Sequence, residues 1–292
     1  MKRVVLIDGS SYIYRAFYAL PSLTSPKGEP TGAIYGFIRM ISKLLKELQP
    51  EYIAVAFDYP GKTFRHEEYK EYKATRKETP DELKAQIPKI KQILKLWGIK
   101  VIEIPGYEAD DIIATLAKKA VEKGFEVIIV TPDKDMLQLV NDKIKVLNPV
   151  NDELFDKDKI KEKYGIYPEQ FVDFLTLIGD KVDNLIGVHG IGTKTAQKLL
   201  NQYKDIEEIY KNLDKLKEKQ KKSFEEAKER INLNKKLIQL KTDTPLDMEI
   251  EELKKEKTDM TNLKEMFHNL GFKSLKIEEE KKENQIKQGR LF

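Results

Sequence analysis

Short apolar runs alternate with longer amphipathic segments in the first half of the chain. The runs RVVLI, YIAVAF, KVIEIPGY and FEVIIVTP are each followed by a helical pattern. Continuous apolar runs of this kind are typical of buried strands, and strands that alternate with helices favour a mostly parallel sheet. We therefore expect an α/β fold in which helices flank a mostly parallel central sheet.

The second half has a different pattern. From about Tyr203 to Leu240 it is helical and highly charged, and Lys241 to Leu246 predicts a connection that returns to the main sheet. The last stretch lacks an apolar face until its end, which predicts a flexible tail. We expect an N-terminal α/β domain at residues 1–175, a C-terminal helical domain at 176–275 and a tail at 276–292.

Composition excludes several classes of site. The 292 residues include no cysteine and only 3 histidines, so disulfides and thiolate zinc sites are excluded and a histidine-rich metal site is disfavoured. Apolar runs fall short of the roughly 18 residues that a membrane helix needs, and the chain opens directly into a strand rather than a signal sequence. We expect a cytoplasmic protein that does not contact a membrane.

Acidic side chains follow the four predicted strands at the point where each strand ends. They are Asp8, Asp58, Glu108, Asp110, Asp111, Asp133 and Asp135. Interaction with a helix dipole explains the cluster that begins at Glu108, but it does not explain four clusters in matching positions. The carboxyl ends of parallel strands share one edge of a sheet, so we expect these groups to converge in one crevice.

Converging carboxylates repel one another unless cations neutralise them. Oxygen ligands without cysteine or clustered histidine favour hard divalent ions, Mg²⁺ or Mn²⁺, over zinc. A further pair, Asp180 and Asp183, is three residues apart and would share one face of a helix. That pair is also compatible with an ordinary solvated helix face.

A glycine-rich turn follows that pair in GVHGIGTKTAQKLL, before a helix that we expect to begin near Thr193. Glycines before a helix N-terminus let backbone amides approach a phosphate oxygen. Residues 187–200 resemble the helix-hairpin-helix motif of sequence-independent DNA binders. That resemblance implies a potassium ion at the turn and phosphate contacts by Gly190, Gly192, Thr193 and Lys194. The alternative is a tight connection without a ligand.

Basic and aromatic residues interleave in KTFRHEEYKEYKATRK, residues 62–77. Such a mixture can neutralise backbone phosphates and stack on unpaired bases of a single strand. An ordinary charged amphipathic helix is the alternative. The segment follows Asp58 directly, so it begins at the carboxylate crevice.

Together these stretches resemble the 5′-nuclease domain of bacterial DNA polymerase I and the wider flap endonuclease family. The resemblance spans roughly residues 1–275 in the family's order, and its most specific motifs are GYEADD, TPDKD and GDKVDNLIGVHGIG. It implies a 5′-3′ exonuclease and flap endonuclease that cuts DNA at a 5′ flap, nick or 5′ end in replication and repair, RNA primers included. It also implies a helical arch over residues 62–95. Since the chain ends at Phe292, we expect a stand-alone nuclease, for which a separate DNA polymerase is a candidate partner. We also expect a monomer.

The resemblance also implies roles for individual residues. It implies two divalent ions held by Asp8, Asp58, Glu108, Asp110, Asp111, Asp133, Asp135, Asp180 and Asp183. Lys73 and Arg76 are then catalytic groups that reach the scissile phosphate. The expected DNA contacts are Tyr14, Arg15, Arg65 and Tyr72, the last by stacking on a base.

The sequence ends in QGRLF, which looks like the pentapeptide that bacterial replication proteins insert into the sliding clamp. Gln288, Leu291 and Phe292 are the expected clamp contacts.

Three other interpretations fit less well. Haloacid-dehalogenase-like phosphatases need a second aspartate where this chain has Ser10. PIN-type ribonucleases share a carboxylate-edged sheet but lack the helix-hairpin-helix unit. A non-enzymatic DNA-junction or clamp-binding module would not need all nine carboxylates.

Overall fold

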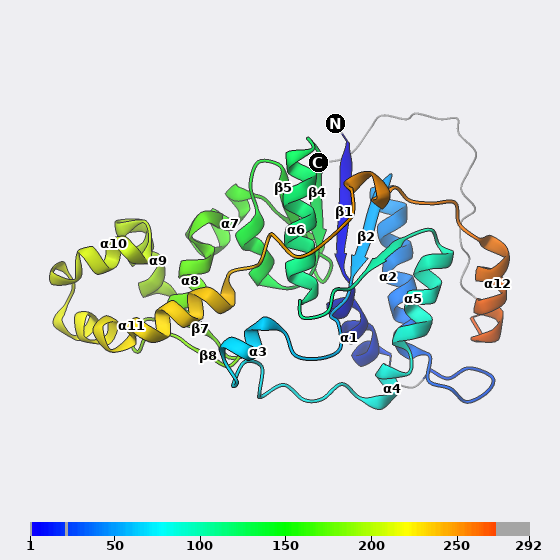
Figure 1. The fold of residues 1–292 in the computed structure, drawn as a ribbon, viewed down its shortest axis with the longest axis horizontal. Coiled ribbons are helices and arrows are strands. Elements are labelled where there is room, and N and C mark those ends of the chain that lie inside the picture. Colours follow the sequence, from blue (N-terminus) through cyan, green and yellow to red (C-terminus); the bar gives the residue numbers. More distant parts are fainter. Residues whose placement is uncertain (1, 21–22, 273–292) are drawn as a thin grey trace.

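A six-stranded sheet forms the centre of the computed structural model, which describes residues 2–20 and 23–272 (Figure 1). The strand order is β3-β2-β1-β4-β5-β6, and every neighbouring pair is parallel except β5 and β6. The predicted mostly parallel sheet is therefore confirmed. The strands are β1 Arg3–Asp8, β2 Tyr52–Ala56, β3 Lys100–Ile102, β4 Glu126–Val130, β5 Ile144–Asn148 and β6 Glu153–Phe155.

Helices cover both faces of this sheet, because the buried strands are apolar on both sides. In β1, Val5 and Ile7 pack into one apolar cluster while Val4 and Leu6 pack into the other. The first cluster includes α1 Gly9–Ala19, α2 Gly32–Leu48, α5 Ile87–Leu96 and α12 Met260–Asn269. The second cluster includes α6 Ala109–Glu122 and the helices that follow the sheet.

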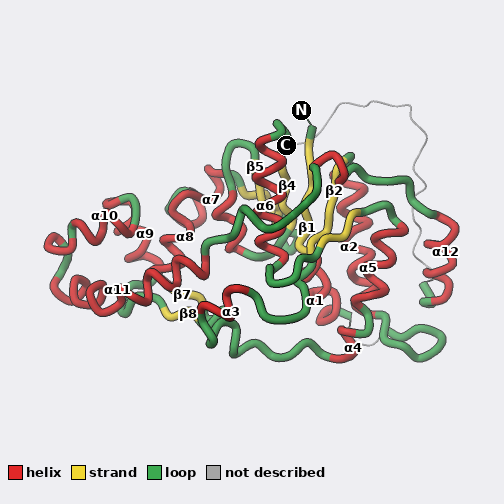
Figure 2. The backbone as a smooth tube through the Cα atoms, viewed as in Figure 1, coloured by secondary structure: helices red, strands yellow, loops and turns green. Residues whose placement is uncertain are grey.

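The helices after the sheet extend to one end of the molecule (Figures 1 and 2). They begin with α7 Lys157–Tyr164, the 3-10 turn η2 Pro168–Gln170 and α8 Phe171–Ile178. A short hairpin, β7 Gly179–Asp180 and β8 Leu185–Ile186, leads to α9 Thr193–Tyr203. The remainder is α10 Ile206–Lys211, η3 Leu213–Lys215 and the long helix α11 Glu218–Ile238.

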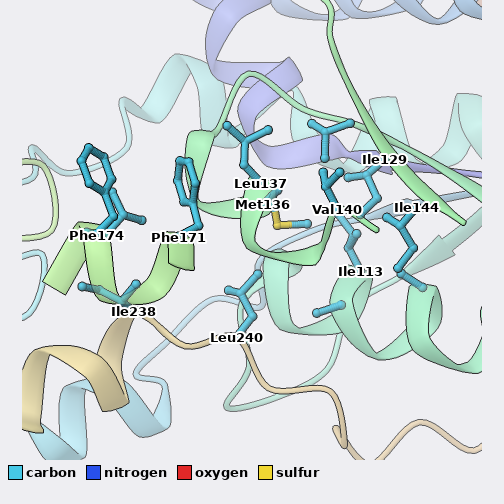
Figure 3. Close-up of a cluster of buried hydrophobic side chains, with 14 of the residues drawn as sticks. Ile113, Ile129, Met136, Leu137, Val140, Ile144, Phe171, Phe174, Ile238 and Leu240 are labelled. Atoms are coloured by element: carbon cyan, nitrogen blue, oxygen red, sulfur yellow. The ribbon is translucent and has the colours of Figure 1, made fainter. Parts of the chain in front are cut away.

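One apolar cluster joins the helical region to the sheet (Figure 3). Phe171 and Phe174 of α8 lie in the same cluster as Met136 and Leu137 of η1, the 3-10 helix Lys134–Leu139. Leu240, just after α11, belongs to this cluster too. The helical region is therefore packed onto the core.

The chain returns from α11 to the sheet as predicted. The backbone amide of Lys241 donates to Asp111 over 2.9 Å, and that of Thr244 donates to Thr115 over 3.1 Å. The 3-10 helix η4 Ile250–Leu253 and a bridge between Tyr52 and Lys254 then carry the chain past the sheet towards α12.

Two predicted helices differ from the structure. The predicted helical arch at 62–95 contains only α3 Phe64–Glu68, a run of turns, α4 Asp81–Lys84 and α5, which is part of the core. Lys73 in the turns has a φ of 55°, a left-handed conformation that interrupts a helix. Asp180 and Asp183 lie in the β7–β8 hairpin instead of a helix, and Gly179 opens this hairpin with a φ of 77°.

Some predictions fall on residues outside the described part of the chain. These include the tail at 276–292 and the clamp contacts Gln288, Leu291 and Phe292. Within the described residues, every helix is too short or too polar to cross a membrane.

Candidate active site

Carboxylates from four strand ends line one pocket at the carboxyl edge of the sheet. Asp8 ends β1, Asp58 follows β2, and Asp133 follows β4. Strands β2 and β4 lie on opposite sides of β1 in the sheet, and a crevice at such a point is where open α/β sheets bind their ligands. The pocket encloses about 60 Å³, room for more than one water-sized group. Its acidic lining is Asp8, Asp58, Glu108, Asp110, Asp133, Asp135 and Asp183.

The loop geometry fixes the first two of these carboxylates. Asp8 caps α1 by accepting from the Ser11 amide over 3.0 Å, and its other oxygen accepts from the Thr131 hydroxyl over 2.8 Å. Asp58 accepts from the Ala109 amide at the start of α6 over 2.8 Å, and its own amide donates to the Ser10 hydroxyl over 2.9 Å. Neighbouring strand ends are therefore tied together at the pocket.

Several of the pocket carboxyls hold their protons more tightly than usual. Burial, with added repulsion from Asp58, raises the pKa of Asp8 to about 6. Burial and the charges of Asp8, Asp133 and Asp58 raise the pKa of Asp110 well above its usual range. Burial and the charge of Asp133 do the same to the pKa of Asp135. Lys73 lowers the pKa of Asp110 and Lys134 lowers that of Asp135, but burial and the neighbouring carboxylates outweigh both effects.

Basic side chains neutralise the other part of the site. The Lys73 ammonium lies 2.6 Å from Glu108 Oε1, and a guanidinium nitrogen of Arg76 lies 2.7 Å from Asp183 Oδ1. Against the effect of burial, Lys73 and then Arg65 lower the pKa of Glu108. Both Lys73 and Arg76 come from the turns that follow α3, so these turns lie directly over the acidic pocket.

Asp180 is held beside the pocket and not in it. Its Oδ2 pairs with the Lys134 ammonium over 2.7 Å, and its Oδ1 accepts from the Val182 amide over 2.7 Å. Together with Asp133, Asp135 and Asp183 it lines a more open neighbouring hollow. Sequence reasoning missed Lys134, although its place between two aspartates in TPDKD was a signal.

The residues present fit a divalent cation. Asp135 lines the pocket, and its Oδ1 is buried without a hydrogen-bond partner, so one oxygen of this carboxyl is left without a donor. Within the described residues, however, no three acidic or histidine side chains form a ready-made coordination set. Three of the nearby carboxylates, Glu108, Asp183 and Asp180, are paired with basic side chains instead.

Asp111 and Arg65 occupy different places from those predicted. Asp111 is 0% exposed and its carboxylate binds the Arg65 guanidinium through two contacts, 2.6 and 2.8 Å long. Arg65 is 1% exposed, so the predicted phosphate contact does not fit its position. Asp110 lines the pocket and Asp111 does not, because adjacent residues of a helix point in directions about 100° apart.

Tyr72 also differs from its predicted role. The residue is 3% exposed, and its single hydroxyl proton is shared between Glu108 at 3.2 Å and Asp183 at 3.0 Å. It joins two carboxylates and is not open to stack on a base. Tyr14 and Arg15, in contrast, lie exposed on α1, where the Tyr14 hydroxyl contacts that of Thr79.

The glycine-rich turn lies at the start of α9, as predicted. Gly192 caps the helix, Gly190 has a φ of 75°, and Gly190, Gly192, Thr193 and Lys194 are all exposed. The hairpin β7–β8 joins this turn to Asp180 and Asp183, so the turn and the acidic pocket are consecutive along the chain.

Two protein-family models cover most of the chain. Residues 3–165 match the 5′-3′ exonuclease, N-terminal resolvase-like domain, and residues 166–261 match the 5′-3′ exonuclease, C-terminal SAM fold. A 5′-3′ exonuclease of Aquifex aeolicus is 47% identical over 100% of both chains. The DNA polymerase I of Caldicellulosiruptor bescii is 42% identical over 94% of this chain, which spans 33% of that polymerase.

Solved structures show the same fold at low sequence identity. The T5 5′-exonuclease with bound zinc has a TM-score of 0.69 at 22% identity, covering 92% of this chain and 100% of that one. The catalytic core of Rad2 in complex with a DNA substrate has a TM-score of 0.62 at 19% identity, covering 92% of this chain and 88% of that one. The family models and the relatives at 47% and 42% identity show that the chain belongs to the 5′-3′ exonuclease family.

Proposed function

We propose that this chain hydrolyses phosphodiester bonds of DNA at 5′ flaps, nicks and 5′ ends with Mg²⁺ or Mn²⁺ as cofactor. The pocket of converging carboxylates, with the unpartnered Asp135 oxygen, carries this proposal. Solved neighbours support it, since a bacteriophage T5 flap endonuclease was crystallised with DNA and metal ions. Oxygen-only ligands favour Mg²⁺ or Mn²⁺ over softer metals.

The pocket residues would hold two ions at the carboxyl edge of the sheet. The candidates are Asp8, Asp58, Asp110, Asp133 and Asp135, with Glu108, Asp180 and Asp183 available once their basic partners move. Ions bound there supply an activated water and neutralise the charge that develops on the leaving oxygen. Asp111 is not a candidate metal ligand, because both of its carboxylate oxygens accept hydrogen bonds from Arg65.

Lys73 and Arg76 are the proposed catalytic groups on the protein side. Both pair with carboxylates of the pocket, so their positive charges lie where a scissile phosphate would enter. A phosphate that replaces the carboxylates as the partner of Lys73 and Arg76 would be stabilised as negative charge develops on it during cleavage. The turns that carry Lys73 and Arg76 belong to residues 62–95, the segment that we propose arches over the cut strand.

Outside the pocket, we expect DNA to contact exposed residues of α1 and the glycine-rich turn at the start of α9. Tyr14 and Arg15 on α1 and Lys194 on α9 are accessible to phosphates. Gly190, Gly192 and Thr193 present exposed backbone at the start of α9, where a duplex phosphate and a potassium ion can bind. RNA primer removal, a monomeric state, a separate polymerase and clamp binding by the C-terminal pentapeptide stay predictions.

Changing Asp110→Asn tests the assignment of the pocket. We expect Mg²⁺-dependent cleavage of a labelled 5′-flap substrate to fall at least about a hundredfold, since a ligand charge is lost. Duplex binding should stay unchanged in a gel-shift assay. The matched control is Asp142→Asn, an exposed carboxylate paired with Lys157 away from the pocket. Flap cleavage by Asp110→Asn at the wild-type rate would overturn the assignment.

Changing Lys73→Ala tests its catalytic role. We expect the single-turnover rate to fall by about a hundredfold while the Kd for the flap substrate changes little, because the ammonium acts on developing charge. Lys95→Ala, at an exposed position of α5, is the control. A variant that loses affinity but cleaves bound DNA at the normal rate would show that Lys73 only binds.

The raised carboxyl pKa values predict a pH-dependent metal affinity. Asp8, with a pKa of about 6, and Asp110 and Asp135, whose pKa values are raised well above the usual range, bind protons at low pH, and a metal ion must displace those protons. Mn²⁺ binding to the metal-free protein should therefore tighten by about tenfold or more from pH 5.5 to pH 7.5. Isothermal titration at several pH values measures this. A constant affinity would contradict the proposed ligands.

A further inference from the structure

The connection after α11 passes directly behind the acidic pocket. Leu237, Ile238 and Leu240 line the pocket together with the carboxylates. Ile238 and Leu240 are also buried in the apolar cluster that joins the helical region to the sheet (Figure 3). A shift of α11 therefore displaces residues that form a wall of the site.

A buried ion pair ties this connection to the start of α6. Arg65 Nε donates to the Leu237 carbonyl over 2.8 Å while its two terminal nitrogens hold Asp111. Asp111 in turn accepts from the Lys241 amide over 2.9 Å. The same guanidinium donates to Glu108 over 3.2 Å. One guanidinium thus joins α3, the first turn of α6 and the end of α11.

A second polar link ties the connection to the aspartates after β4. The Gln138 amide nitrogen donates to the Asp135 carbonyl over 2.9 Å and to the Ile238 carbonyl over 3.1 Å. Its amide oxygen accepts from the Leu240 amide over 3.1 Å. The two links clamp residues 237–241 between the two segments that carry Asp110 and Asp135.

We infer that the Arg65–Asp111 pair is a positioning device that couples DNA binding by the helical domain to the metal affinity of the carboxylate pocket. The inference rests on the proposed function, because it assigns duplex binding to the helical domain and metal binding to the pocket. Asp111 does not line the pocket, and Arg65 is only 1% exposed at its wall, so we assign the pair a positioning role and not a ligand role. Their effect passes through Glu108 and Asp110, which the first turn of α6 carries, and through residues 237–241.

The coupling requires the shape of the guanidinium and not only its charge. Arginine offers five donors in a rigid plane, and all of the Arg65 nitrogens have acceptors within 3.5 Å. A lysine at this position keeps the charge but presents its donors from a single atom, so it cannot reach both Asp111 and the Leu237 carbonyl.

The test is a linkage measurement on the full chain. Mn²⁺ affinity is titrated with and without a closed dumbbell duplex, which has no 5′ end to cleave. In the wild type the duplex should tighten Mn²⁺ binding about fivefold or more, and Mn²⁺ should tighten duplex binding by the same factor. In Arg65→Lys, and independently in Asp111→Asn, we expect that factor to fall close to one. The affinity for each ligand alone should change much less.

The control is Lys236→Ala, which removes an exposed ion pair between α11 and Glu68 of α3. It cuts a surface contact between the same helices, and the coupling factor should stay at the wild-type value. Thermal unfolding shows that each variant is folded. A merely structural role would lower stability and leave the ratio of affinities unchanged.

Two results would overturn the inference. One is a folded Arg65→Lys protein with the wild-type coupling factor, and the other is a wild-type chain whose Mn²⁺ affinity does not respond to DNA. Loss of the proposed function looks different, because the wild type would then fail to cleave a 5′ flap in Mg²⁺ at all.

Discussion

Repulsion among carboxylates is the constraint on which the rest of this structure depends. A parallel sheet brings its strand ends to one edge, and here four of those ends carry acidic side chains into a pocket of about 60 Å³. Bringing like charges together and burying them is costly unless protons or cations compensate. Below about pH 6 a proton does so for Asp8, whose pKa rises to about 6, and basic side chains do so for Glu108 and Asp183.

This compensation explains why an otherwise irregular segment lies over the pocket. Residues 69–76 form turns and not a helix, yet the segment is tied down by Lys73, Arg76 and the Tyr72 hydroxyl. The same groups are the ones that a phosphate would meet first. The charges of Lys73 and Arg76 therefore both hold the segment in place and take part in the proposed chemistry. A ligand that breaks their ion pairs with Glu108 and Asp183 must offer them new negative partners.

Charged and polar side chains near the pocket also connect the helical region to the sheet. Apolar side chains of α8 and of the connection after α11 share a core with the sheet, and Arg65, Asp111 and Gln138 bind the same connection through hydrogen bonds. The helical half is thus in contact with the backbone that positions the carboxylates. The glycine-rich turn before α9 reaches the pocket by a second route, through the β7–β8 hairpin.

The sequence predicted the sheet and the convergence of its acidic strand ends, because both follow from apolar runs and the direction of the strands. It could not separate Asp110 from Asp111, since adjacent helical residues face different directions and only the fold shows which one meets Arg65. It also placed Asp180 and Asp183 in a helix, although Gly179 starts a hairpin there. Tyr72 and Arg65 lie in a basic, aromatic pattern that suits nucleic acid, but tertiary packing buries both.

The central claim is that carboxylates from separate strand ends together hold divalent ions. Anomalous diffraction from crystals soaked in Mn²⁺ tests it most directly, because Mn²⁺ scatters strongly and takes oxygen ligands. The account predicts Mn²⁺ peaks inside the pocket, within coordination distance of Asp110 and Asp135, with Lys73 moved away from Glu108. Peaks confined to surface carboxylates, with the pocket ion pairs intact, would contradict it.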